Sequence, residues 1–284
     1  MSNNKILAEY LSADKLRPFE GHPFQVKDDE EMNQLVWSII TQGVLNPIMV
    51  RPLDTGEYEV ISGHRRVHAC RKAGIDEIPA LIYSLDRDAA AIALVDSNLH
   101  REHILPSEKA FAYKLKRDAM NHQGKTSPQV GEKLLTVEKI GLDSGDSKNQ
   151  VLRYIRLTYL IPEILRMVDE GRISLTPAVE LSYLTEAEQR DLLETMESED
   201  CTPSLSQAIQ MKALSQSGQL DMDKIFAIMT QPKANQQEKI SFKVAELRDY
   251  FPRHYTAAQM MQEIMVALKE RQQRLQRQRN RDAR

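Results

Sequence analysis

The sequence predicts an α+β protein with a small α/β N-terminal domain, an all-α domain and a small, mostly helical C-terminal module. Between residues 12 and 85, short apolar runs bounded by glycine and proline alternate with helical patterns, which is typical of a small α/β unit. From residue 86 onward, apolar residues recur at helical spacing almost to the end. The polar segment 231–239 indicates a linker before the last module. We therefore place the domains at residues 1–103, 104–230 and 231–284.

The first helix is predicted at residues 28–43. Five apolar residues recur there with the spacing of one buried stripe, namely Met32, Leu35, Val36, Ile39 and Ile40. Asp28 can cap the start of this helix, and Gly43 can end it. Three strands are predicted after it, at 46–52, 54–62 and 77–85. A second helix lies between the last two strands and ends at Gly74.

The charge distribution permits a nucleic-acid partner although the formal net charge is -3. Residues 269–284 hold seven basic and two acidic side chains, so the rest of the chain is acidic and any further nucleic-acid site must be a local patch. Cys70 and Cys201 lack a CxxC spacing, which disfavours a disulfide framework and a structural zinc site. No apolar run reaches the roughly 18 residues of a spanning helix. We expect a cytoplasmic protein that does not contact the membrane.

The segment GHRR at 63–66 predicts a phosphate site. A strand that ends in Gly63 and leads directly into a helix presents unpaired backbone N–H groups and the positive end of the helix dipole to one point. Arg65 and Arg66 add donors suited to phosphate oxygens. Basic residues at a helix start oppose the dipole, which favours an anionic ligand, although a solvated helix start is the alternative. A metal bound by His64, His68 and Cys70 is disfavoured because further ligands are missing nearby.

A second polar cluster lies in DSNLHREHILPSEKAFAY at 96–113. Asn98 and Arg101 are three residues apart, which predicts that they share one helix face. Beside the GHRR helix, an amide and a guanidinium would extend a phosphate pocket. The alternative is a corner between two helices.

Residues 132–160 have the pattern of a helix-turn-helix. The first helix is predicted to end at about Gly141 and to be followed by a Gly/Asp/Ser turn longer than usual, with Ser147 as the N-cap of the second helix. Val151 and Ile155 would face inward, with Leu152 and Tyr159 at the flank. Lys148, Asn149, Gln150 and Arg153 would face outward, and these side-chain types read base edges and phosphates in a major groove. The alternative is a solvated helical hairpin.

Taken together, these motifs resemble the ParB family of partition proteins. LRPFEGHPFQVK at 16–27, GHRRVHACRKAG at 63–74 and SNLHREHILPSEKA at 97–110 are similar to three sequence blocks of that family, in the same order. The resemblance covers roughly residues 14 to 215. It implies a sulfiredoxin-like N-terminal domain that binds CTP with Mg²⁺ and acts as a clamp on DNA, followed by a helix-turn-helix domain.

The resemblance also assigns residues. It implies that the triphosphate is cradled by Gly63, His64, Arg65 and Arg66, with Asn98 and Arg101 completing the pocket, Asn98 near the metal and Gln25 helping to close it. Ser97, which we include in the nucleotide site, stands where the family often has a glutamate tied to hydrolysis. Weak CTPase activity is therefore left open. His64 replaces a frequent glutamate of the family, and the arginines would still hold the phosphates.

For the helical domain, the resemblance implies recognition of a palindromic, centromere-like site on double-stranded DNA. We expect base contacts from Lys148, Asn149 and Arg153, with Ser147 and Gln150 beside them and Lys125 and Thr126 near backbone phosphates. Residues 239–284 would form a homodimer through an apolar stripe (Met260, Ile264, Ala267 and Leu268) and bind DNA through the basic end. A ParA-type ATPase is an implied partner, and the protein would be associated with the nucleoid or a plasmid.

Two other classes of function compete with this interpretation. A helix-turn-helix transcriptional regulator whose ParB-like domain no longer uses nucleotide is the main alternative. An enzyme is disfavoured, because Gly63 stands where the sulfiredoxin reductases carry their catalytic cysteine. A ParB-like nuclease or kinase is disfavoured as well, because the sequence offers no carboxylate pair placed to hold a catalytic metal.

Overall fold

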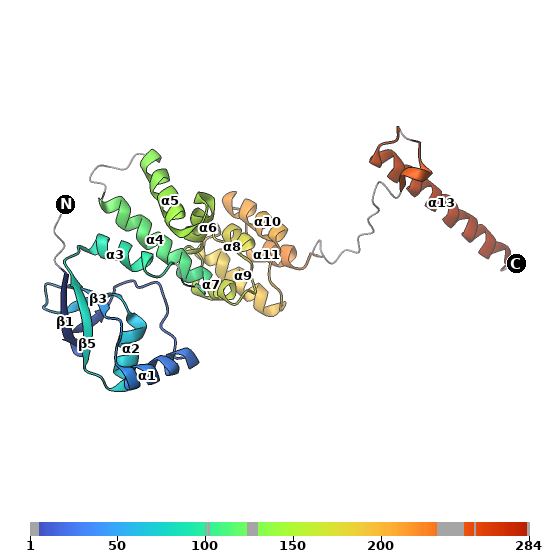
Figure 1. Cartoon of the computed structure of the whole chain (residues 1–284). Coiled ribbons are helices and arrows are strands. Elements are labelled where there is room, and N and C mark those ends of the chain that lie inside the picture. The colour runs from blue at the N-terminus through green and yellow to red at the C-terminus, as the bar shows by residue number, and fades with distance from the viewer. Residues whose placement is uncertain are drawn as a thin grey trace. The chain divides into compact units, whose positions relative to one another are not determined.

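The computed structural model describes residues 6–99, 101, 103–123, 130–231, 247–252 and 254–282. The chain divides into two compact units, Met1–Gln231 and Pro232–Arg284. The first unit contains a mixed sheet followed by helices, and the second contains one long helix (Figure 1). The predicted α+β class is confirmed.

The sheet has five strands in the order β1-β5-β3-β4-β2. Their bounds are β1 Ile6–Ser12, β2 Leu16–Pro18, β3 Ile48–Pro52, β4 Tyr58–Ser62 and β5 Glu77–Tyr83. β1 pairs with β5 and β3 with β4 in antiparallel fashion, whereas β3 pairs with β5 and β2 with β4 in parallel. A 3-10 turn at Ala13–Lys15 joins β1 to β2.

The sequence did not predict β1 or β2. β1 carries no alternating pattern, because Ile6, Leu7 and Tyr10 are all exposed and Leu11 alone among its apolar residues is buried. β2 has three residues and ends in proline, a combination that occurs at sheet edges, where no ladder hydrogen bond is lost. Both are edge strands, and tertiary pairing rather than local pattern determines them.

Helices α1 (Glu30–Gln42) and α2 (His64–Ala73) lie side by side against the sheet (Figure 1). Asp29, not the predicted Asp28, caps α1, because its side chain accepts the N–H of Met32 at 2.9 Å. Gly43 ends α1 with a positive φ, as predicted. Of the predicted stripe, Met32 and Ile39 are buried, Leu35 and Val36 are partly buried, and Ile40 is 59% exposed.

Helices then continue to the end of the first unit. They are α3 Arg87–Asp96, α4 Pro106–Gln123, α5 Val130–Ser144, α6 Lys148–Leu157, α7 Pro162–Asp169, α8 Leu175–Leu181, α9 Glu186–Ser198, α10 Leu205–Gln216 and α11 Met222–Met229. One core fills the space between the sheet and its two helices, a second joins α3 and α4 to α5 and α6, and a third lies among α7 to α11. None of the described helices is long and apolar enough to span a membrane.

The connection between α5 and α6 is shorter than predicted. α5 continues through Gly141 to Ser144, and Gly145, with φ of 75°, begins a three-residue turn. Gly141 permits this tight return, since a Cβ there would lie 2.6 Å from the carbonyl oxygen of Asp146. The glycine that the sequence suggested as a helix end is therefore a point of close backbone approach inside the helix.

The second unit contains a 3-10 turn at Arg248–Tyr250 and the helix α13 (Ala257–Asp282). The mostly helical C-terminal module that the sequence predicts contains this long helix. Thr256 caps it, because its hydroxyl accepts the N–H of Gln259 while the Gln259 side chain accepts the N–H of Thr256. The sequence ISFK at 240–243 favours a short strand, and these residues lie outside the described ones.

Gly63 offers a direct test of the strand-to-helix junction. It has a φ of +103°, and a Cβ there would lie 2.7 Å from Cγ2 of Ile48, whereas Gly21 has a φ of +77° and open space around it. We expect Gly21→Ala to lower the free energy of unfolding by about 1 kcal/mol. Gly63→Ala should cost about 1–3 kcal/mol more because of the clash. Urea unfolding followed by circular dichroism measures both, and equal losses would contradict the close approach.

Candidate functional site

A pocket of about 780 Å³ lies where the segment before α1, the start of α2 and the segment before α4 meet. Its lining residues are Gln25, Lys27, Asp29, Glu31, Arg65, Arg101, His103, Ile104, Leu105 and Glu108. Three of the predicted nucleotide residues, Gln25, Arg65 and Arg101, are thus brought together although they are far apart in sequence. Lys27 and His103 are additional basic groups that the sequence analysis did not single out.

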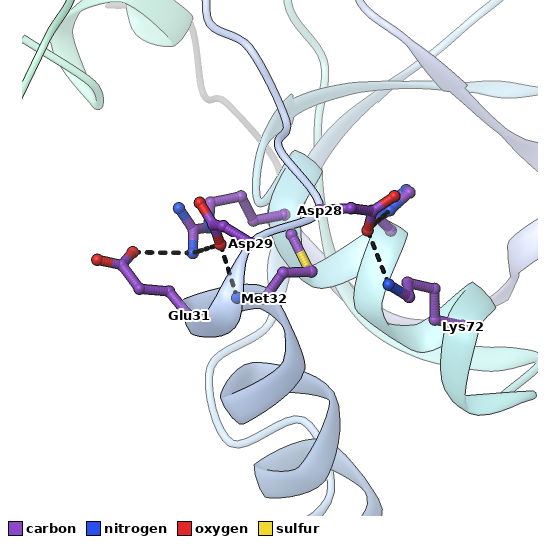
Figure 2. A network of polar contacts seen from close by, with 7 residues as sticks. Asp28, Asp29, Glu31, Met32 and Lys72 are labelled. Carbon is purple, nitrogen blue, oxygen red and sulfur yellow. Dashed lines mark hydrogen bonds and ion pairs between the residues drawn. The ribbon is translucent and has the colours of Figure 1, made fainter.

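Arg65, in the first turn of α2, is held by acidic residues at the start of α1. Its Nη2 donates to Oε2 of Glu31 at 3.1 Å and lies 4.0 Å from Oδ1 of Asp29 (Figure 2). Glu31 has a side chain that is 76% exposed, so this ion pair is weak and exchangeable. Arg65 can therefore be released to an anion that enters the pocket.

Asp28 lies on the other side of the same segment and points toward Lys72 of α2 (Figure 2). One of its oxygens accepts from Nζ of Lys72 at 2.8 Å and contacts Nε2 of His68 at 2.9 Å. Hydrogen bonds from Lys72 and then His68 hold the pKa of Asp28 below its usual value. Asp28 thus joins α1 to α2 instead of capping α1, and His68 has a carboxylate partner.

The two arginines of GHRR have different partners. Arg66 turns toward the loop before β3, where its Nη1 donates to the carbonyl oxygens of Asn46 and, at 2.6 Å, Pro47. Burial lowers the pKa of its guanidinium. Arg66 is therefore engaged in holding the loop that faces Gly63, and Arg65 is the arginine that lines the pocket.

His64 is paired with a histidine that the sequence analysis missed. The rings of His22 and His64 are in contact, with centroids 3.7 Å apart and planes tilted by 38°, and Nε2 of His64 accepts the backbone N–H of Phe19 at 3.4 Å. Burial lowers the pKa of His22 to about 4 and that of His64 to about 3, and the charge of Arg101 contributes to both shifts. Both rings are neutral at pH 7, so His64 adds no positive charge to a phosphate site.

Asn98 and Arg101 do not share a helix face, contrary to the prediction. α3 ends at Asp96, and the side chains of Ser97 and Asn98 both donate to the carbonyl oxygen of Leu94. These bonds end the helix because they use an acceptor of its last turn. Asn98 is buried beneath the turn, whereas the guanidinium of Arg101 lies 5.5 Å from the ring centre of Phe24. Neither Ser97 nor Asn98 lines the pocket.

Glu108 is a buried pocket residue that the sequence analysis also missed. Its carboxylate accepts the backbone N–H of Gln25 at 2.8 Å and that of Leu105 at 3.1 Å. Position N3 of α4, directly after Leu-Pro-Ser, is a known place for a glutamate that reaches back to the helix start. No pattern in the sequence around Glu108 indicates its contact with Gln25, which lies 83 residues away.

The predicted outward face of α6 is present in part. Ser147 caps the helix by accepting the N–H of Gln150 at 3.2 Å, and Val151 and Ile155 are buried, as predicted. Arg153 donates to Oγ1 of Thr176 at 2.6 Å and to Oε1 of Gln150 at 3.4 Å. Asn149 is exposed, and Lys148 is partly exposed. Lys125 and Thr126 lie outside the described residues.

The size of the pocket and its cationic side chains suit a small anionic ligand. Lys27, Arg65 and Arg101 offer cationic donors, and cavities of roughly 300–1,000 Å³ hold small ligands. The lining also holds three carboxylates, those of Asp29, Glu31 and Glu108. Among the described residues, no group of three His, Cys, Asp or Glu side chains is placed to hold a metal ion. Mg²⁺ commonly binds through one or two side chains, waters and substrate phosphates, and Asn98 is the residue predicted for it.

The fold consists of a small α/β domain that carries the pocket, joined to a helical domain, and comparisons with known proteins identify the first domain. Residues 1–99 match the family model of the ParB N-terminal domain. The resemblance carried by the motifs is confirmed, and this part of the chain belongs to that family.

Similarity extends beyond the first domain. A probable chromosome-partitioning protein ParB of Vibrio cholerae is 29% identical over 239 residues, which are 84% of this chain and 77% of that protein. A nucleoid occlusion protein of Listeria innocua is 33% identical over 66% of this chain and 62% of its own length. A structure of C-terminally truncated ParB from Caulobacter crescentus complexed with CTP-gamma-S is 24% identical over 67% of this chain and 99% of that one, with a TM-score of 0.32.

The contacting histidines His22 and His64 predict a pH dependence of stability. Since their pKa values are lowered in the folded protein, the unfolded chain binds more protons below pH 6.5, and stability falls as the pH drops toward about 4. The slope should be about 1.4 kcal/mol per pH unit for each histidine. Urea unfolding at several pH values should show a shallower slope for His22→Phe. His122→Gln, whose side chain is 70% exposed in the native protein, should keep the native slope, and an unchanged slope in His22→Phe would contradict the assignment.

Proposed function

We propose that the protein is a ParB-type partition protein that acts as a CTP-dependent clamp on DNA. The proposal rests first on the convergence of Gln25, Arg65 and Arg101 on one pocket. These residues come from three segments that resemble sequence blocks of the ParB family. The match of residues 1–99 to the ParB N-terminal domain supports the inference that this chain binds the nucleotide implied by that resemblance. CTP would supply the phosphates, and Mg²⁺ would be bound by them and by waters. The predicted metal ligand Asn98 does not fit this role, because it is buried and does not line the pocket.

The residues of the pocket would have distinct tasks. Arg65 would exchange Glu31 for a phosphate oxygen, and Arg101 would reach the phosphates from the segment before α4. Gly63 would let the phosphates approach the start of α2, whose first turn contains no acidic residue. His64 and Arg66 would shape the site, His64 through His22 and Arg66 through the loop carbonyls, without contacting the nucleotide.

DNA would be read by α5 and α6 as a helix-turn-helix, with α6 in the major groove. Lys148, Asn149 and Arg153 would contact bases, and Ser147 and Gln150 would lie at the groove entrance. A palindromic site requires two copies of the chain, which we propose pair through α13. Of the predicted stripe, Leu268 is 51% exposed, whereas Met260 is buried at 1%. Met261 and Met265, which were not part of that stripe, are 52% and 49% exposed. The complex would be associated with nucleoid or plasmid in the cytoplasm, with a ParA-type ATPase as partner.

The nucleotide proposal predicts selective CTP binding that depends on Arg65. Arg65→Ala should weaken it roughly 10- to 100-fold, because a charge-assisted hydrogen bond contributes about 1.5–3 kcal/mol. Calorimetric titration with CTP, ATP and GTP in the presence of Mg²⁺ measures this, with and without DNA. Arg87→Ala is the matched control, since Arg87 forms an exposed ion pair with Glu20 and does not line the pocket.

The outcomes separate two functions. CTP binding that is lost in Arg65→Ala and kept in Arg87→Ala supports the clamp. Absence of binding by any nucleotide, even with specific DNA present, would instead support a helix-turn-helix regulator whose ParB-like domain no longer uses nucleotide.

The DNA proposal predicts that Arg153→Gln reduces discrimination between a preferred duplex and a scrambled one by about 1–3 kcal/mol if Arg153 reads a base. The preferred duplex would be recovered from a random pool by the native protein. Fluorescence anisotropy measures both affinities. Thr176→Val is a useful companion variant, because it removes the partner of Arg153 and leaves its charge. Native discrimination in Arg153→Gln would place recognition on other residues.

A second candidate role, nucleoid occlusion, is suggested by the name of the Listeria relative. It would use the same DNA-bound clamp. Deletion of the gene separates the roles: partition predicts loss of the replicon that carries the binding site, whereas nucleoid occlusion predicts division across nucleoids.

A further inference from the structure

Five side chains of the helical domain form a continuous row of alternating cations and tyrosine rings, here called the cation–tyrosine row. In spatial order they are Lys114, Tyr159, Arg156, Tyr183 and Lys212. The Arg156 guanidinium lies 4.4 Å from the ring centre of Tyr159 and 4.0 Å from that of Tyr183. Nζ of Lys212 lies 3.8 Å from the second ring, and Nζ of Lys114 lies 5.8 Å from the first. Helices α4, α6 and α10 and the turn after α8 thus contribute to one surface.

A buried side-chain amide holds the two turns that carry the tyrosines of the row. Gln189 is 1% exposed, and its Nε2 donates to the carbonyl oxygens of Tyr159 and Leu184. The same side chain accepts the N–H of Ile161 at 2.8 Å. The two turns that carry the tyrosines are therefore tied to one residue, and Arg156 is tied to the second turn by bonds to the hydroxyl and carbonyl oxygens of Ser182.

The charges of the row are only partly neutralised. Among the described residues, Lys114 and Arg156 have no carboxylate within ion-pair distance, whereas Lys212 pairs with Glu180 at 2.8 Å. On α4, the neighbouring lysines Lys109 and Lys116 are both paired with aspartates. The hydroxyls of Tyr159 and Tyr183 have no hydrogen-bond partner in the described part of the chain, and both residues are exposed, at 55% and 40%. The surface offers donors and unpaired positive charge, which suits an anion.

The row continues the proposed DNA-reading face of α6. Arg156 follows Arg153 by three residues and Asn149 by seven, a spacing that places all three on one side of the helix. Arg153, like Arg156, bonds neutral partners and no carboxylate. A duplex that meets Asn149 and Arg153 would therefore pass beside Arg156.

We propose that the cation–tyrosine row contacts the phosphodiester backbone of the duplex that α6 reads. The inference rests on the proposed DNA-binding function and adds a contact that carries affinity without sequence preference. DNA fits better than an acidic peptide, because the row is continuous with α6 and its unpaired donors would face a regular series of phosphates. Ring contacts hold Lys114 and Arg156 in place without cancelling their charge.

The salt dependence of DNA binding tests this contact in the full-length protein. The probes are the duplex recovered from a random pool and a scrambled duplex of equal length, followed by fluorescence anisotropy over a range of salt concentrations. Lys114→Gln and Arg156→Gln should each reduce the magnitude of the negative slope of log K against log salt by about 1. Each should weaken binding to the two duplexes by the same factor. Discrimination between the duplexes should stay native.

Two control variants isolate charge from packing. Arg156→Lys loses the same bonds to Ser182 as Arg156→Gln but keeps the positive charge, so it should retain the native slope. Lys224→Gln changes the net charge equally and lies in an ion pair on α11, so it should also retain the slope. A native slope in both Lys114→Gln and Arg156→Gln would overturn the inference. An equal loss of slope in Arg156→Lys and Arg156→Gln would overturn it as well, because the effect would then come from packing.

Failure of this inference can be distinguished from failure of the proposed function. If the native protein selects a duplex and Arg153→Gln loses discrimination while the row variants keep the native slope, this inference fails and the proposed function stands. If the native protein binds no duplex, both fail.

Discussion

A buried ammonium group connects the two halves of the first unit. Lys116 of α4 is 1% exposed and donates to Asp96 at the end of α3 and to Asp143 near the end of α5, at 2.6 and 2.7 Å. Burying a charge costs several kcal/mol unless its partners are in place, so the three helices are constrained to one arrangement. Asp96 directly precedes Ser97 and Asn98, and Asp143 lies two residues before Gly145, where the turn into α6 begins. The proposed nucleotide motif and the proposed DNA-reading helix are thereby attached to the same lysine.

The basic side chains divide into two groups according to their partners. Lys116, Arg66 and Arg71 give their donors to protein groups and hold helices and loops in place. Arg65 and Arg101 border a pocket, and Arg156 borders the surface beside α6. Because a chain with net charge -3 has no general attraction for polyanions, any binding of a polyanion would depend on such local cations and on the basic C-terminal end.

The sequence predicted correctly those features that depend on residues only a few positions apart. Ser147, Val151 and Ile155 were assigned correctly because a cap and an i, i+4 pair are visible in the sequence. β1 and β2 were missed because pairing at sheet edges is decided by residues far along the chain, and Asp28 was mistaken for a cap because Asp28 and Asp29 are equivalent in sequence. His22 and Glu108 entered the site only through contacts with residues 42 and 83 positions away. The motif GHRR likewise predicted where the pocket lies, but it did not predict that Arg65 and Arg66 have different partners.

The lining of the pocket suggests how nucleotide and DNA could act on each other. Arg65 belongs to α2, and Arg101 belongs to the segment that leads into α4, the helix that carries Glu108 and Lys116. An anion that binds both arginines would favour one placement of that segment, and through the Asp96–Lys116–Asp143 contacts it would favour one placement of α5 and α6. If bound nucleotide strengthens DNA binding by favouring this placement, then bound DNA strengthens nucleotide binding by the same free energy, because coupling between two sites is reciprocal. On the proposed function, DNA bound at α6 would therefore change the affinity of the pocket for CTP by the same factor by which CTP changes the affinity for DNA.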